Sequence, residues 1–302
     1  MYPDNNWYGH RYILAEYCNT FDKPCFASIQ HGWYKTFKVG NRKFTNAPFL
    51  CWNEKIHESC VQAGDKNVHL IGSPFLYLDK ILKKKNKIKT KVTNGTLFFP
   101  AHSAPKTDRF MFKEKDPEVI QRVNHELMID EITKISKPPY TVCFFYADYT
   151  DENISIYKKH NWRIICLGKR STNNFLYKLH DEISKVDSVI CSDLSTTVFY
   201  SLYLKKKVKV IFEINKNSIN TIHNNDNVKF KNQYYANYPE LYDSFLNGEK
   251  GYEFAKKELG FNFIKSEEEI KNICGWNNII KNFFSKIYSF ILDLKHGKSL
   301  RN

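Results

Sequence analysis

The chain has no long apolar run and no paired cysteines, and each absence excludes a class of protein. No stretch of about 18 consecutive apolar residues occurs among its 302 residues, so the sequence predicts no membrane-spanning helix. The eight cysteines include no Cys-x-x-Cys pair, and their spacing predicts neither a zinc site nor a disulfide framework. A reducing, cytoplasmic setting is the expectation that follows.

Several phosphate- and metal-binding signatures are also missing. The sequence contains no Walker loop, no G-x-G-x-x-G fingerprint and no aromatic RNA-binding signature. No D-x-D lies in an obvious metal loop, which argues against a metal-dependent sugar-nucleotide transferase with a single Rossmann domain. The first residues show no basic-then-apolar leader pattern, and no internal repeat is present.

The charge of the chain is strongly one-sided. Its 46 Lys and Arg residues outnumber 32 Asp and Glu residues, which gives a net charge of +14. Such a balance indicates an anionic partner: a nucleotide-linked substrate, an anionic membrane surface or nucleic acid. A compositional bias toward Lys, Asn and Ile is the alternative explanation. Hydrophobic residues make up 42%, enough for one large domain or two ordinary ones.

From residue 96 onward, apolar strand-like runs alternate with helical patterns. Alternation of this kind predicts βαβ units and a parallel, Rossmann-like sheet. A helix is expected to start at Asp116-Pro117-Glu118, because a capping acid precedes a proline there. The other expected helices are 154–160, 176–186 and the segment after Ser195, and the expected strands are 96–99, 141–146, 163–167, 189–191 and 208–212.

The flanking regions are expected to be smaller units. A helix at 8–17 and strands at 26–29, 48–51 and 68–71 are predicted before a basic break at 81–95. Near the end, Gly260 is expected to close a helix and Ser266 to open another in a capping box. A final apolar helix over 280–294 fits either an inter-domain contact or a membrane interface. The predicted domains are 1–90, 91–265 and 266–302.

A cluster of small hydroxyl residues follows the predicted strand 189–191. It consists of Ser192, Asp193, Ser195, Thr196 and Thr197, directly before a helical pattern. In a parallel sheet, this turn brings free N–H groups and the helix dipole to one place, which favours phosphate. An ordinary helix cap is the alternative interpretation.

Two further turns at strand ends carry histidine or lysine. His102 and Ser103 follow the strand 96–99, and Gly168, Lys169 and Arg170 follow the strand 163–167. Because the carboxyl ends of parallel strands share one edge, these residues are predicted to contact donor phosphates with the hydroxyl cluster. Polar turns without a role are the alternative.

His31 follows a predicted strand and precedes Gly32. An imidazole titrates near neutrality, so His31 is a candidate base for an acceptor hydroxyl, and Lys35 is a candidate phosphate contact. A loop histidine packed beside Trp33 is the alternative.

These segments resemble a known group of enzymes. Residues 187–196 (Asp-Ser-Val-Ile-Cys-Ser-Asp-Leu-Ser-Thr) are similar to a motif of teichoic-acid glycerophosphotransferases and related bacterial capsule-polysaccharide enzymes. His31-Gly32 with Lys35 is similar to their H-G-x-x-x-K motif, with the lysine one position early. Gly72-Ser73-Pro74 resembles a G-x-P-R-x-D turn that here lacks Arg and Asp. Residues 99–103 look like the strand-end histidine motif of bacterial GT-B glycosyltransferases, including sialyltransferase-like ones.

The resemblance implies a GT-B architecture of two Rossmann-like domains facing a cleft, with a small or incomplete N-terminal one. It implies a metal-independent glycosyltransferase of surface-polysaccharide synthesis that uses no cofactor, with His31 as base and Lys35 beside it. The implied partners are a nucleotide-sugar donor, a poly- or oligosaccharide acceptor in free or lipid-linked form, and an anionic membrane surface, but no nucleic acid. The implied location is the cytoplasm, including the inner face of the membrane.

Two alternatives remain beside this interpretation. One is a transferase that moves a phosphorylated polyol from a CDP donor. The other is a non-catalytic basic protein that binds nucleic acid or a membrane surface.

Overall fold

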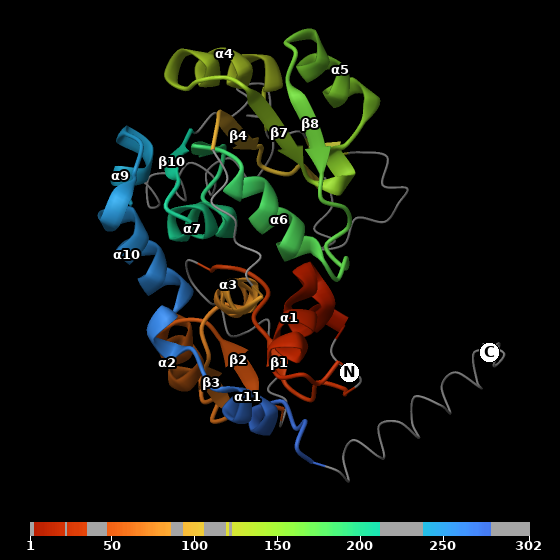
Figure 1. Cartoon of the computed structure of the whole chain (residues 1–302), viewed down its shortest axis with the longest axis vertical. Helices are drawn as coiled ribbons and strands as arrows, with labels where there is room; N and C mark the ends of the chain where they lie inside the picture. The colour runs from red at the N-terminus through yellow and green to blue at the C-terminus, as the bar shows by residue number, and fades with distance from the viewer. Residues whose placement is uncertain are drawn as a thin grey trace, which may run out of the picture. The chain divides into compact units, whose positions relative to one another are not determined.

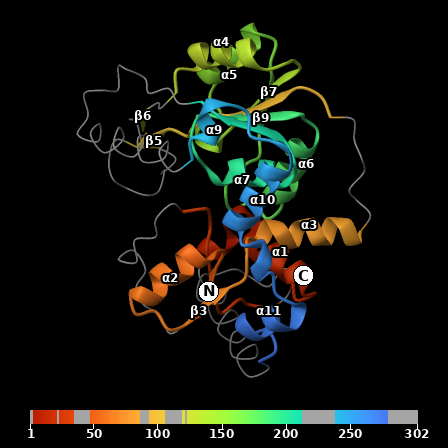
Figure 2. The same cartoon turned by 90° about the vertical axis from the view of Figure 1, so that its left-hand side faces the viewer.

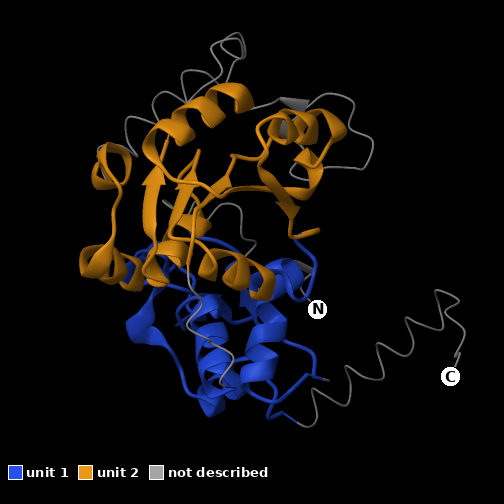
Figure 3. Cartoon of the chain, turned by 45° about the horizontal axis from the view of Figure 1, so that its top comes forward, with its two compact units in different colours: residues 1–88, 170–176, 257–302 blue, residues 89–169, 177–256 orange. Residues whose placement is uncertain are grey.

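The computed structural model describes residues 3–21, 23–34, 47–85, 93–105, 119–120, 123–211 and 238–278. The chain divides into two compact units (Figure 3). Unit 1 comprises residues 1–88, 170–176 and 257–302, and unit 2 comprises residues 89–169 and 177–256. Both contain parallel strands and helices, so the protein has a mixed α/β fold. The domain boundaries expected near residues 90 and 265 stay predictions.

Unit 2 is built on a five-stranded sheet with the order β10-β9-β4-β7-β8, in which every neighbouring pair is parallel. The chain starts at the central strand β4, adds β7 and β8 on one side, and then crosses back to add β9 and β10 on the other. This arrangement is consistent with a Rossmann-like fold. The strands are β4 (Thr96–Phe99), β7 (Tyr140–Phe144), β8 (Arg163–Cys166), β9 (Ser188–Cys191) and β10 (Lys207–Val210).

Helices cover both faces of this sheet. Helices α4 (His125–Ile135) and α5 (Asp151–Lys159) lie on one face, and α6 (Phe175–Ser184) and α7 (Thr196–Tyr203) lie on the other (Figures 1 and 2). The chain therefore alternates strand and helix as the sequence predicts. Thr150 caps α5 by accepting a hydrogen bond from the backbone N–H of Asn153.

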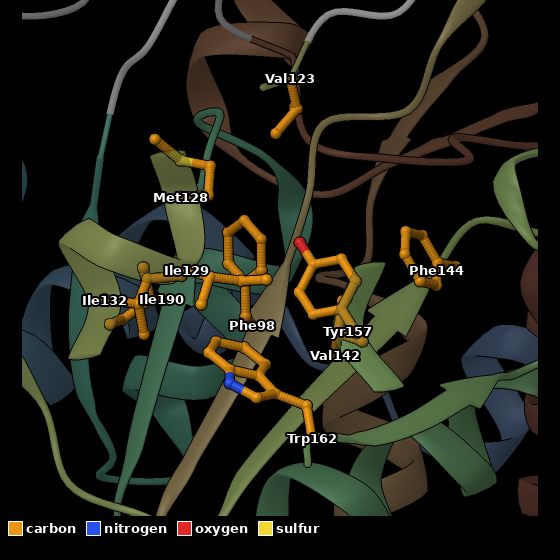
Figure 4. Packing of buried hydrophobic residues seen from close by; sticks show 10 residues of the cluster. All are labelled: Phe98, Val123, Met128, Ile129, Ile132, Val142, Phe144, Tyr157, Trp162 and Ile190. Atoms are coloured by element: carbon orange, nitrogen blue, oxygen red, sulfur yellow. The ribbon is translucent and has the colours of Figure 1, made fainter. Parts of the chain in front are cut away.

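The core between the sheet and helices α4 and α5 consists mainly of aromatic and branched aliphatic side chains (Figure 4). Trp162 meets Phe98 edge-on at 6.5 Å and stacks on Tyr140 at 4.8 Å, measured between ring centroids. Burying each large apolar side chain stabilises the fold by roughly 1.5–3 kcal/mol. The buried residues of this cluster are Phe98, Val123, Met128, Ile129, Ile132, Val142, Phe144, Tyr157, Trp162 and Ile190.

The helix expected to begin at Asp116-Pro117-Glu118 begins later. Those three residues lie outside the described ranges, but Val119–Ile120 form strand β6, antiparallel to β5 (Ala104–Pro105). Helix α4 starts at His125, because the Asn124 side chain accepts from the N–H of Leu127. Unit 2 also contains η3 (Tyr146–Asp148), α9 (Glu240–Asp243) and most of α10 (Gly248–Leu259).

Unit 1 contains a parallel sheet with the order β1-β2-β3. The outer edge of β1 is occupied by an amide side chain in place of a strand. Asn5, which is fully buried, accepts from the N–H of Ile29 at 2.8 Å and donates to the carbonyl of Ala27 at 2.6 Å. The first elements of the unit are η1 (Pro3–Gly9), α1 (His10–Tyr17), β1 (Ser28–Ile29), β2 (Phe49–Cys51) and β3 (Val68–Leu70).

Two helices of unit 1 were not predicted. Helix α2 (Glu54–Gln62) is capped by Asn53, and α3 (Pro74–Lys84) is capped by Ser73 with Pro74 in its first turn. The predicted break at 81–95 is therefore wrong at its start, where α3 continues.

The expected signals near the end of the chain are confirmed. Gly260, with φ of 72°, follows α10, and Ser266 forms a complete capping box with Glu269 at α11 (Glu267–Ile273). A short turn, η5 (Phe261–Phe263), connects the two helices. The predicted helix 280–294 lies outside the described residues.

All eight cysteines are free thiols, and seven of them are buried. In the described part of the chain, no helix combines the length and apolarity needed to cross a bilayer.

Candidate functional site

The candidate site of unit 2 lies where the strand order reverses. Strands β4 and β9 are neighbours, but the next strand after β4, which is β7, lies on one side of the pair, and the next strand after β9, which is β10, lies on the other. In open α/β sheets, ligands bind outside the carboxyl ends of the two strands at such a point. The loops that follow Phe99 and Cys191 are therefore the elements to examine.

A hydrogen bond ties these two loops together. The backbone N–H of Ala101 donates to Oγ of Ser192 at 2.6 Å, and the N–H of Ser192 donates to the carbonyl of Phe99 at 3.1 Å. Ser192 is 4% exposed, so its hydroxyl serves this contact inside the protein. The His102 loop and the hydroxyl cluster consequently form one continuous rim.

The hydroxyl cluster opens helix α7. Ser195 occupies the N-cap position with extended backbone angles, but its side chain does not bond to the helix backbone. Thr196 and Thr197 form the first two positions of the helix, and all three residues are half-buried. The positive end of the helix dipole and three hydroxyl groups therefore meet at this rim, which suits an anion.

Asp193 adds a carboxylate to the same turn. Its Oδ1 accepts from the backbone N–H of Leu194 at 2.7 Å, and the residue is half-buried. A carboxylate repels phosphate but accepts hydrogen bonds from sugar hydroxyls, as acidic residues do toward ribose in dinucleotide-binding sheets.

His102 and Ser103 are held by an acid that the sequence reasoning missed. Ser103 donates two hydrogen bonds to the Asp148 carboxylate, one from its hydroxyl to Oδ1 and one from its N–H to Oδ2, the latter at 3.1 Å. Nδ1 of the exposed His102 lies 2.8 Å from the carbonyl oxygen of Ser103. An N–H on Nδ1 would donate to that oxygen and leave Nε2 for a ligand.

A small cavity lies beside this network. Its volume is about 10 Å³, room for about one water molecule, so a nucleotide does not fit inside it. His125 lines the cavity, and burial lowers its pKa to about 4, partly opposed by Glu126. His125 is therefore neutral at neutral pH. The lining residues are Pro100, Ala101, Ser103, Val123, His125, Phe144 and Asp148.

Gly168 and Lys169 lie at the same edge of the sheet but farther along it. They follow β8, which is separated from β4 by β7. With strands about 4.8 Å apart, the end of β8 is roughly 10 Å from the end of β4. The structure thus brings His102, Ser103, Asp193, Ser195, Thr196 and Thr197 to two adjacent strand ends, and places Gly168 and Lys169 two strands away from β4.

His31 belongs to unit 1, just after β1. The Tyr34 hydroxyl lies 2.6 Å from its Nδ1 and 3.1 Å from its Nε2, and the Trp7 ring meets it edge-on at 4.8 Å. His10 is completely buried nearby, and burial, followed by the charge of His31, lowers its pKa to about 3. Lys35 lies outside the described residues.

Metal ligation has no candidate in the ranges that the structure describes, because no three His, Cys, Asp or Glu side chains there come close enough to share an ion.

One site residue, Asp148, is missing from the predictions made from the sequence, although its position in the chain could have indicated it. Asp148 follows β7 as His102 follows β4, at the carboxyl end of a strand. The same rule that selects His102 therefore also selects Asp148. Ser192 lies within the hydroxyl-rich turn, but its role as a link to Ala101 depends on strand order.

Unit 2 thus has the sheet order and the polar carboxyl edge of a Rossmann-like α/β structure. No protein-family description and no curated protein matches the chain. Among solved structures, the wall teichoic acid polymerase TagF, in a single-substitution form, is similar at 14% sequence identity with a TM-score of 0.27. The match covers 91% of this chain and 66% of that chain, so this chain spans just under two thirds of its length. A TM-score this low assigns neither a fold nor a function.

Proposed function

We propose that the protein is a GT-B-type transferase that moves a sugar from a nucleotide-activated donor to a surface-polysaccharide acceptor. In this proposal the two units face one cleft, and the protein works in the cytoplasm or at the inner face of the membrane. The observation that carries it is the rim at β4 and β9, where the Ala101–Ser192 hydrogen bond joins a histidine loop to a hydroxyl-rich helix start. Such a rim suits the diphosphate of a nucleotide donor.

The proposed chemistry divides between the units. His31 accepts the proton of an acceptor hydroxyl, whose oxygen attacks the anomeric carbon as the bond to the nucleotide oxygen breaks. The departing phosphate gains negative charge, which the N-terminus of α7 and the hydroxyls of Ser195, Thr196 and Thr197 stabilise. Lys169, at the end of β8, adds positive charge at the same edge of the sheet. The proposal uses no metal ion and no cofactor, and it retains Lys35 as the predicted phosphate contact.

Transfer of a polyol phosphate from a CDP-linked donor has equal support, because the same rim suits a CDP group. The two reactions differ in the bond that breaks. A nucleoside-diphosphate sugar releases a nucleoside diphosphate, whereas CDP-polyol releases CMP.

A nucleotide screen tests the proposal. Binding to the folded state raises its free energy of unfolding by about 2.7 kcal/mol when the ligand is at 100 times its Kd. We expect at least one of CMP, CDP, UDP and GDP to raise the melting temperature, and Thr196→Val to reduce that shift. The matched control is Thr133→Val on α4, whose hydroxyl bonds only within its own helix.

The products then distinguish the two reactions. Release of a nucleoside diphosphate from a sugar donor supports the first, and release of CMP from CDP-glycerol supports the second. The proposal fails if no nucleotide stabilises the protein, which would leave the non-catalytic binding alternative.

A further inference from the structure

A cation from the loop after β8 belongs to unit 1 and lies near His31. Residues 170–176 group with unit 1, although the residues on either side of them group with unit 2. The guanidinium carbon of Arg170 lies 3.9 Å from the centroid of the Trp7 ring. Trp7 also contacts His31: the two ring centroids are 4.8 Å apart and the ring planes meet at 82°. Arg170, Trp7 and His31 therefore form a continuous series of contacts.

The backbone around this series is closely constrained. The N–H of Tyr8 donates to the carbonyl of Arg170, and a Cβ on Gly9 would lie 2.1 Å from the carbonyl oxygen of Asn173. Tyr8 itself has a φ of 57°, which non-glycine residues adopt at a cost. The Tyr8 ring packs on Phe175 at 5.0 Å. These contacts fix the place where the Arg170 side chain leaves the loop.

The guanidinium of Arg170, which lies over the Trp7 ring, has N–H donors available for a ligand. A guanidinium that stacks through its face leaves its N–H groups pointing outward in the plane. Arg170 is half-buried, and no acidic side chain of the described residues pairs with it. Trp7, His31 and Tyr34 beside it are also half-buried, so the series reaches solvent.

We propose that Arg170 binds an oxyanion, phosphate or carboxylate, carried by the acceptor whose hydroxyl faces His31. The planar fork of arginine matches both oxyanions with two parallel hydrogen bonds. The half-buried Trp7 and Tyr34 rings provide an apolar surface for the sugar or polyol that carries the charge. This inference rests on the proposed role of His31, and it makes the site selective for a charged acceptor over a neutral one.

The test follows the His31 imidazole by NMR without donor or turnover, so it does not depend on transfer. Glucose 6-phosphate, glucuronate and glucose are added at matched ionic strength, and the His31 signal is assigned from its loss in His31→Asn. An oxyanion bound beside an imidazole stabilises the charged form, so it raises the pKa of His31. We expect this rise with one or both charged sugars and not with glucose.

The variants separate binding from packing. Arg170→Gln should raise the Kd of the charged sugar about tenfold. Arg170→Lys keeps the charge but loses the planar fork, so its Kd should lie between those of the wild type and Arg170→Gln. The control is Lys205→Gln, which removes a cation stacked at 4.7 Å on Tyr252 in unit 2 and should leave binding unchanged.

Three results overturn the inference: no response of His31 to either charged sugar, an equal response to glucose, or an undiminished response in Arg170→Gln. The last result would make the Trp7 stack purely structural. If Arg170→Gln does not fold, the comparison between wild type and Arg170→Lys decides. A nucleotide screen that fails while His31 responds would refute the transferase proposal alone.

Discussion

Ser103 donates both its hydroxyl and its backbone N–H to the carboxylate of Asp148. Ser103 is 3% exposed and Asp148 is 8% exposed, so water cannot easily replace the hydrogen bonds between them. Since His102 bonds to the carbonyl of the same Ser103, a carboxylate on the loop after β7 determines the position of a ring on the loop after β4.

Replacing Asp148 should therefore affect stability and ligand binding together. Asp148→Ala leaves two buried donors of Ser103 without an acceptor, which should cost about 1–3 kcal/mol in the free energy of unfolding. Nucleotide affinity should fall as the His102 loop loosens, and Asp148→Asn should retain part of both. Urea unfolding and nucleotide titration measure the two effects. Asp130→Asn, an exposed acid on α4, is the control, and equal behaviour of the two Asn variants would contradict the prediction.

Substitution of the two histidines of the proposed mechanism should have different effects on transfer rate and donor affinity. His31→Ala should reduce transfer about 10²–10⁴-fold because the general base is lost, while donor affinity stays nearly unchanged. His102→Ala should weaken donor affinity first, because His102 lies on the β4 loop. Initial rates and donor titrations distinguish the two, with melting temperatures confirming that both variants fold. Wild-type turnover in His31→Ala would exclude His31 as the base.

Stability should decline in mild acid because two buried histidines resist protonation. The pKa is about 3 for His10 and about 4 for His125, both lowered mainly by burial from an ordinary value of 6.5. Below pH 6.5 the unfolded chain therefore binds protons that the folded chain does not, and stability is full above that pH. The expected loss is about 1.4 kcal/mol per pH unit and per histidine.

Urea unfolding between pH 7.5 and 5 measures this slope, which His125→Asn should roughly halve. Tyr157→Phe is the control, because it removes the hydroxyl 3.0 Å from Nδ1 of His125 and keeps the imidazole. A slope that is unchanged in His125→Asn would show that other groups cause the acid sensitivity.

Substitutions at two glycines of unit 1 distinguish the cost of backbone strain from the cost of a steric clash. Gly64 has a φ of 88° with open space around it, whereas Gly260 has a φ of 72° and a Cβ there would lie 1.7 Å from the carbonyl oxygen of Trp52. Gly64→Ala should cost about 1 kcal/mol from the left-handed backbone alone. Gly260→Ala should cost at least about 2 kcal/mol more, because backbone must move. Similar unfolding midpoints for the two variants would contradict this reading.

The strands of unit 2 were predictable because each is a short apolar run closed by a local turn signal. Their neighbours were not, since nothing in the run before Ser192 says that it pairs with β4 and not with β8. The contact between Ala101 and Ser192, and the reach of Asp148 to Ser103, both depend on that order. The sequence therefore predicted which turns are polar, but not which of them meet.

The helices show a second limit. Helix α3 was missed because its last turn, which ends at Lys84, lies in a basic run that the sequence analysis interprets as a break. Asp116-Pro117-Glu118 has the residues of a helix start, yet Asn124 provides the cap of α4. Local signals of similar strength compete, and tertiary packing decides between them.

The amide of Asn5 has a consequence for self-association. An open strand edge is a template on which another chain can add a strand, and proteins commonly block such edges. Asn5 occupies the donor of Ile29 and the acceptor of Ala27, the pair that an incoming strand would need. The Asn5 side chain thus blocks the addition of a further strand at this edge of the unit 1 sheet. Its loss would leave these backbone groups free to pair with a strand of another chain.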